Sequence, residues 1–143
     1  MWVSRTYANI AVGTAVMNAI APTTAVFNQY EHSARSKVLA ILAHAGYESP
    51  GTALTDGTDS AAFLRSVCVA QLCREAAGNR KGITFPVAVT DAFELLNAVY
   101  EKRLPVPGMT PSTSAGYGGV KISAGTGSAA RPQVFARGKL TGY

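Results

Sequence analysis

The side chains of this sequence with the clearest capacity for chemistry are its two histidines, His32 and His44. Both fall on one predicted helix, twelve residues apart, which places their Cβ atoms about 18 Å apart along the helix axis. Two imidazoles at that distance cannot share a metal ion within one chain. We expect His44 to lie near the helix C-terminus, where it interacts favourably with the helix dipole, and His32 to lie on a polar face.

Two cysteines, Cys68 and Cys73, are five residues apart in another predicted helix. Five residues correspond to about 500° of helical rotation, or about 140° net, so the two thiols face apart. They are therefore poor disulfide partners, and they form neither a Cys-x-x-Cys pattern nor a cysteine–histidine metal site. The sequence predicts buried free thiols in a reducing compartment, which favours assembly in a cytoplasm.

Other patterns that suggest ligand binding lack the residues that such sites need. Asp56 and Asp59 lie in a Gly/Thr-rich loop without the further acidic ligands and the closing Glu of a calcium site, so we interpret the loop as a turn. The glycines at 116–119 and 125–127 do not follow a strand and open a helix, as phosphate-binding loops do. We therefore expect no catalytic residue, no metal and no cofactor, and we expect that the protein is not an enzyme.

Hydrophobic periodicity predicts that helices carry these side chains. The most regular stripe has apolar or small residues at helical spacing: Phe27, Tyr30, Ala34, Val38, Ile41, Leu42 and Ala45. Thr23 or Thr24 is the expected N-cap of this helix, and Gly46 is the expected terminating glycine. Further helices are expected near 8–20, at 61–77 after an N-cap at Ser60, and from Val87 or Asp91 to Arg103.

The composition divides the chain into a helical domain, residues 1–104, and a long C-terminal segment. Residues 1–104 carry nine Lys/Arg and eight Asp/Glu, whereas residues 105–143 carry four cations and no carboxylate. Residues 105–130 are rich in Pro, Gly, Ser and Thr, which predicts a flexible linker with a possible short strand at 120–123. Residues 131–143 mix apolar side chains with cations as a C-terminal arm. The predicted fold is mainly α, a small antiparallel helical bundle with a long extended arm and no membrane span.

The C-terminal half resembles the Mu-like group of tailed-bacteriophage head–tail connector, or adaptor, proteins. In that group a helix with a Leu-Pro exit is followed by a variable Gly/Ser-rich linker and a terminal R-x-F-x-R-x-x-L-x-G-(F/Y) motif. The helix and its exit are matched here by Leu95, Leu96, Val99, Leu104 and Pro105. The terminal motif, the most specific part, is matched from Phe135 onward, with an arginine and a valine just before it; the residues are Arg131, Val134, Phe135, Arg137, Leu140, Gly142 and Tyr143.

This resemblance implies a structural virion protein of the phage neck, located at the head–tail interface and assembled in the host cytoplasm. The subunits would form a ring, commonly of about twelve copies, that docks on the portal and lies next to a downstream stopper or tail protein. Packaged DNA would pass through the ring with only non-specific proximity to it. The implied portal-docking residues are the apolar anchors Val134, Phe135, Leu140 and Tyr143, with the cations Arg131, Arg137 and Lys139 facing acidic portal residues.

Two other functions remain open at the level of the sequence. The four cations after residue 104 could serve a small nucleic-acid-binding accessory protein. Their spread over about forty residues predicts weak, salt-sensitive binding, and no recognition helix is evident. The second alternative is another virion ring, such as a tail terminator or stopper, although such rings are usually strand-rich.

Overall fold

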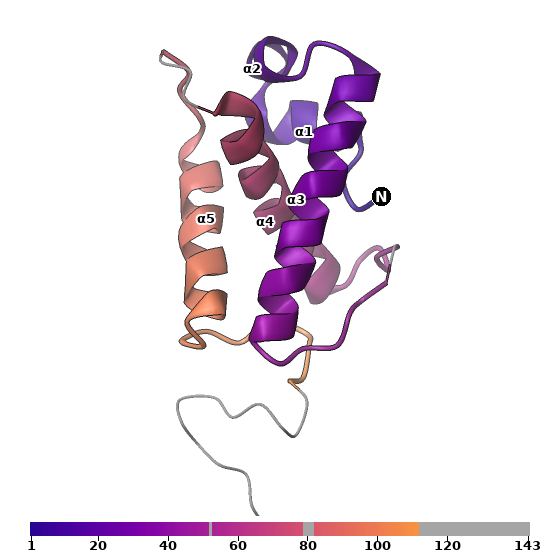
Figure 1. The fold of residues 1–143 in the computed structure, drawn as a ribbon, viewed down its shortest axis with the longest axis vertical. Coiled ribbons are helices and arrows are strands. Elements are labelled where there is room, and N and C mark those ends of the chain that lie inside the picture. Colours follow the sequence, from indigo (N-terminus) through magenta and orange to yellow (C-terminus); the bar gives the residue numbers. More distant parts are fainter. Residues whose placement is uncertain (52, 79–81, 112–143) are drawn as a thin grey trace, which may run out of the picture.

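Helices build the part of the chain that the computed structural model describes, which comprises residues 1–51, 53–78 and 82–111 (Figure 1). These residues form five helices and no strand: α1 (Arg5–Val12), α2 (Thr14–Ile20), α3 (Thr24–His44), α4 (Asp59–Ala77) and α5 (Val87–Tyr100). The expected mainly α fold is confirmed. The expected Gly/Ser-rich arm and the possible strand at 120–123 lie outside the described residues.

Helix α4 is the central element of the bundle. It packs against both α3 and α5, which run antiparallel to it (Figure 1). The helix predicted at 61–77 is confirmed, and the residues buried at helical spacing along one of its sides are Phe63, Leu64, Val67, Cys68, Leu72 and Ala76. Residues on its other sides are buried as well, namely Ala61, Val69, Ala70, Gln71, Cys73 and Ala77. A helix that is apolar nearly all round lies in a core, which explains why neighbours cover α4 from several directions.

The N-terminal region forms two short helices where the sequence predicts one helix near 8–20. Helices α1 and α2 meet at Gly13, whose φ of 108° is not helical and is rarely adopted by residues with a Cβ. The prediction is also wrong about the start, because α1 begins at Arg5. The hydroxyl of Ser4 accepts the Tyr7 N–H at 3.1 Å and caps the helix there.

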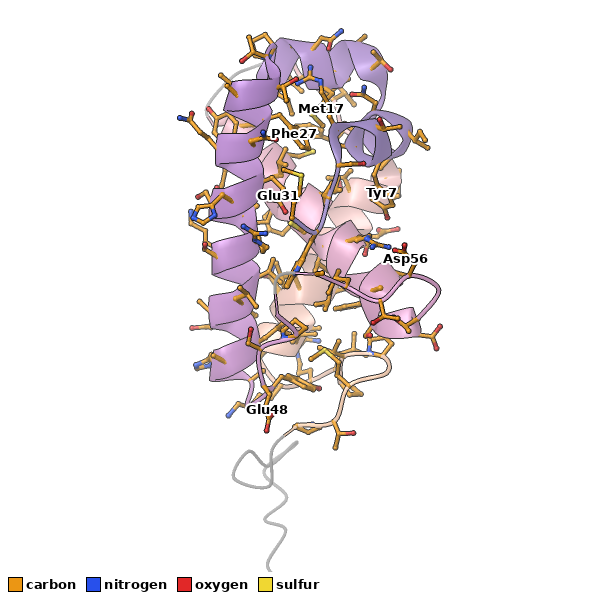
Figure 2. The ribbon with its side chains drawn as sticks, turned by 90° about the vertical axis from the view of Figure 1, so that its right-hand side faces the viewer. Tyr7, Met17, Phe27, Glu31, Glu48 and Asp56 are labelled. Atoms are coloured by element: carbon orange, nitrogen blue, oxygen red, sulfur yellow. The ribbon has the colours of Figure 1, made fainter. Side chains whose placement is uncertain are left out.

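Helices α1 and α2 cover the end of the bundle at which α3 begins (Figure 1). Met17 of α2 and Phe27 of α3 are fully buried at this end (Figure 2). Ala8 of α1 and Ile20 of α2 are buried in the same core. The two short helices therefore close one end of the hydrophobic core.

The ends of α3 follow the signals in the sequence. The Thr23 hydroxyl accepts the N–H of Val26 at 3.2 Å and caps the N-terminus. At the other end Gly46 has a left-handed φ of 93°, and the Tyr47 N–H donates to the Leu42 carbonyl at 2.9 Å. This is a Schellman motif, so the prediction that Gly46 terminates the helix is confirmed.

The start of α4 differs from the prediction, because Thr58 caps the helix in place of Ser60. Thr58 has extended backbone angles, and its hydroxyl accepts the Ala61 N–H at 3.2 Å. Ser60 lies inside the first turn. Serine and threonine are both good N-caps, so local preference does not decide between two hydroxyl residues that are two positions apart.

The end of α5 also differs from the prediction, since the helix ends at Tyr100 and not at Arg103. Lys102 takes a left-handed φ of 60°. The Arg103 N–H donates to the Ala98 carbonyl at 2.8 Å, and the Lys102 N–H donates to the Val99 carbonyl at 3.0 Å. This is a Schellman motif with lysine at the position that glycine prefers, so no glycine marks the end of α5 in the sequence.

Candidate functional site

The chain leaves the described body at the end of the bundle opposite α1 and α2 (Figure 1). The Val106 N–H donates to the Tyr47 hydroxyl at 2.9 Å, and the Val106 side chain is 1% exposed. A Cβ at Gly108 would lie 3.2 Å from the backbone nitrogen of Ser60, so the glycine allows close approach to the start of α4. These contacts fix the position from which the C-terminal segment starts.

The expected portal-docking residues lie outside the described residues. They are Arg131, Val134, Phe135, Arg137, Lys139, Leu140 and Tyr143. Packing of the body continues past residue 104, because Val106 is buried and Met109 packs against the core. The division into residues 1–104, 105–130 and 131–143 stays a prediction, and so does the docking function of the arm.

The two histidines occupy separate positions on the surface of α3. His32 is exposed, and its Nδ1 lies 3.1 Å from Nη2 of Arg35. His44 lies in the last turn and stacks on Tyr100 of α5, with 4.5 Å between the ring centroids. The placements of His32 on a polar face and of His44 at the helix end are confirmed. The stacking depends on how α3 and α5 pack, which no local pattern reveals.

The two cysteines are buried free thiols, as predicted. The pKa of the Cys68 and Cys73 thiols is raised to about 12; burial is the main cause at both, and at Cys68 the nearby carboxylate of Glu31 contributes to the rise. Because the thiolate is the nucleophilic form, both thiols are unreactive at neutral pH. Both side chains pack in the hydrophobic core.

The aspartates of the loop before α4 have structural partners. Asp56 pairs with Arg65 of α4, and Asp59 lies in the first turn of α4, where the helix dipole favours a carboxylate. Within the described ranges, no three His, Cys, Asp or Glu side chains are grouped so that they could hold a metal ion. Over the same ranges, no helix has the length and apolar character needed to cross a membrane.

The buried carboxylate of Glu31 is a feature that the sequence did not predict. Its Oε2 accepts the N–H groups of Trp2 at 2.9 Å and Val3 at 3.4 Å. The indole Nε1 of Trp2 donates to the Gly51 carbonyl at 3.1 Å, and Nε of Arg65 donates to the Trp2 carbonyl at 3.1 Å. We call these contacts of Trp2 with Glu31, Gly51 and Arg65 the N-terminal clamp.

One signal for the clamp exists in the sequence. Glu31 is four residues after Phe27 and three before Ala34, so it falls on the buried stripe of α3. A carboxylate in a core must accept hydrogen bonds, because an unpaired buried charge is costly. The donors come from a segment near the N-terminus, however, and no local pattern identifies them.

An ion pair joins α3 to α4. Nζ of Lys37 lies 2.9 Å from Oε2 of Glu75, and Nε2 of Gln71 donates to the same oxygen at 2.8 Å. Burial acts to raise the pKa of Glu75, but hydrogen bonds from Gln71, Lys37 and Ser33 outweigh it and hold that pKa below its usual value. The ionised carboxylate therefore helps to hold the two helices together.

Together these contacts describe a helical body whose N-terminus is held by the clamp and whose C-terminal exit is held at Val106. Comparisons with protein-family models, with curated proteins and with solved structures find no match to this chain.

Proposed function

We propose that this chain is a structural protein of a tailed-bacteriophage neck, where copies of it form a head–tail connector ring. In this proposal residues 131–143 dock on the portal, and the ring continues the DNA channel toward a stopper or tail protein. The observation that carries the proposal is the terminal segment. It combines apolar anchors with cations and has no carboxylate: Val134, Phe135, Leu140, Tyr143, Arg131, Arg137 and Lys139.

The described body supports this proposal because a closed ring needs subunits that keep their shape. The central helix α4 is buried on most sides, and the N-terminal clamp attaches Trp2 to Glu31 of α3. The hydrogen bond between Val106 and Tyr47 fixes the point at which the C-terminal segment begins. A docking segment on a fixed attachment point reaches the same partner surface from every subunit of a ring.

The distribution of charge also supports the proposal. Several carboxylates of the body are paired within it, since Glu75, Asp56 and Glu101 each lie next to a lysine or arginine. The C-terminal segment, by contrast, carries four cations and no carboxylate. Such a segment attracts an acidic partner surface. Phenylalanine, tyrosine and arginine in one short segment are also the residue types that dominate the energy of protein interfaces.

Electron microscopy of the chain mixed with the portal ring of the same phage tests this proposal. Full-length protein is compared with a version truncated after Gly127, which retains every described residue. We expect the full-length protein to form a ring coaxial with the portal and the truncated protein to leave the portal bare. Folded full-length protein that does not bind the portal would contradict the connector function.

The cations of the C-terminal segment support one alternative, a small nucleic-acid-binding accessory protein. Cations that bind phosphates release counterions, so such binding weakens steeply as salt rises. If the chain does not bind the portal, a gel shift of nucleic acid at physiological ionic strength would favour this alternative. Truncation after Gly127 should then abolish the shift. Portal binding without a gel shift would favour the connector.

A further inference from the structure

A groove lies between the second half of α4 and the start of α5, which pack side by side (Figure 1). Its volume is about 270 Å³. Half-buried apolar side chains line it, namely Ile83, Phe85 and Phe93. The residues that α4 contributes to the lining include some with little or no side chain to fill the space, namely Ala70, Ala77 and Gly78. The groove therefore offers apolar surface to a side chain of a partner.

The guanidinium of Arg74 also lines the groove, and its N–H donors are free. Its Cζ lies 4.5 Å from the centroid of the Phe93 ring, so the guanidinium is held against an apolar wall of the groove. Within the described ranges it forms no hydrogen bond and no ion pair. The other arginines of these ranges do have polar partners, and they are Arg5, Arg35, Arg65 and Arg103.

No carboxylate in the described residues neutralises Arg74. Its neighbour Glu75 pairs with Lys37 of α3, on another side of α4. Asp91 and Glu94 of α5 are exposed, and neither of them lines the groove. The groove thus combines an apolar surface with one unpaired cation, which favours a partner that is apolar and anionic.

We propose that this α4/α5 groove binds a short acidic segment of a partner protein, in which a large apolar side chain lies close to an Asp or Glu. The apolar side chain fills the space beside Ala77 and Gly78, and the carboxylate accepts hydrogen bonds from Arg74. A planar guanidinium that is already stacked on Phe93 is suited to bidentate binding of a carboxylate. Because the stacking restricts the arginine before binding, less side-chain entropy is lost when the partner binds.

Other occupants fit the groove less well. Nucleic acid would meet a single lining cation, although its affinity for proteins comes mainly from several cations. The arm, residues 131–143, has cations and no carboxylate, so it would bring like charge to Arg74. A free small molecule is usually buried on most sides, whereas the lining residues Arg74, Gly78 and Thr90 are exposed and leave this groove open.

This inference does not depend on the connector function. The groove lies at the start of α5, and the C-terminal segment leaves the body beyond the other end of that helix (Figure 1). A partner in the groove and a portal at the arm therefore use separate surfaces and can be bound together.

Screening a random heptapeptide library on beads with the fluorescently labelled full-length chain tests the inference. We expect the selected peptides to share a large apolar residue within about three positions of an Asp or Glu. Their affinity for the chain is then measured by fluorescence anisotropy.

Variants of Arg74 show whether the selected peptides occupy the groove. Arg74→Gln should bind them about tenfold more weakly than wild type, and Arg74→Lys should recover only part of that loss, because lysine lacks the planar fork. Arg103→Gln is the matched control, since it removes an exposed arginine that follows α5, and it should bind within about twofold of wild type. Circular dichroism confirms that all variants are folded.

Four results would overturn the inference: a library without enriched peptides, enriched peptides that share no acidic residue, an Arg74→Gln variant that binds them like wild type, or 3-phenylpropanoate that binds as tightly as they do. The last result would assign the groove to small carboxylates. Portal binding is measured separately, and Arg74→Gln should bind the portal like wild type. Failure of the groove and failure of the connector function are therefore distinguishable.

Discussion

The backbone N–H of Trp2 donates to the carboxylate of Glu31 at 2.9 Å, which attaches the start of the chain to α3. Glu31 is 1% exposed, so its carboxylate depends on protein donors in place of water. The Val3 N–H is a second donor, and Nη1 of Arg35 lies 4.0 Å from the other carboxylate oxygen. Residues before α1 are therefore an integral part of the body.

Replacing Glu31 by alanine should lower the free energy of unfolding by about 3 kcal/mol, because it leaves the buried N–H groups of Trp2 and Val3 unpaired. Glu31→Gln retains an acceptor and should cost less, about 1–2 kcal/mol. Urea denaturation measures both values. Glu48→Ala removes an exposed carboxylate and, as the control, should change stability by less than about 0.5 kcal/mol. Equal stability of Glu31→Ala and wild type would show that the clamp contributes nothing.

The thiols of Cys68 and Cys73 should resist alkylation in the folded protein, because burial raises the pKa of both to about 12. With iodoacetamide at about pH 8, we expect modification only as fast as the protein unfolds, and rapid modification of both in urea. Mass spectrometry counts the added groups. Fast labelling of either cysteine without denaturant would contradict the buried placement.

The ion pair of Lys37 with Glu75 should make stability depend on pH. The pKa of Glu75 is lowered in the folded protein from its ordinary value of 4.5, so its contribution is present above that value and lost as pH falls through the folded pKa. Lys37 is 59% exposed, so we expect Glu75→Gln to cost only about 0.5–1 kcal/mol at neutral pH. Urea denaturation from neutral to acidic pH should show the difference in the free energy of unfolding between wild type and Glu75→Gln becoming smaller. A difference that stays constant into the acidic range would contradict the role of the carboxylate.

Lys102→Gly should stabilise the protein, because Lys102 holds a left-handed φ of 60° at the end of α5. Glycine removes the steric cost of the Cβ but loses more backbone entropy on folding. The net effect should be a gain of about 0.5 kcal/mol in the free energy of unfolding. Lys102→Ala is the matched control, since it removes the same charged side chain but keeps the Cβ and should give no such gain. Thermal unfolding compares the two variants, and equal melting temperatures would speak against the left-handed conformation.

The parts of the fold that sequence could predict are those with local signals. The stripe from Phe27 to Ala45 and the glycine at position 46 define α3, and the apolar side of α4 is visible in its spacing. The breaks were not predictable in the same way. Gly13 divides one apolar stretch into two helices, and Lys102 ends α5 without a glycine. Glycine at position 13 permits a break but does not require one, and at Lys102 the chain adopts a left-handed conformation that the propensity of lysine does not indicate.

Contacts between residues far apart in the sequence were less predictable than the helices. Glu31 and Trp2 meet across 29 positions of sequence, and Tyr47 reaches Val106 across 59. The stacking of His44 on Tyr100 likewise needs the relative placement of two helices. Such pairs depend on tertiary packing, whereas a single sequence carries only local periodicity. The portal-docking residues rest on sequence alone, because they lie outside the described residues.

The affinity of the portal ring for variants of the C-terminal arm tests the connector proposal most directly. Phe135→Ala removes an apolar anchor, and Arg137→Ala removes a cation of the terminal motif. Lys121→Ala removes the same charge from the linker and is the matched control. By biolayer interferometry we expect each arm variant to bind the portal about tenfold more weakly or worse, and the control within about threefold of wild type. Portal binding that is equally strong in all four proteins would contradict docking through the arm.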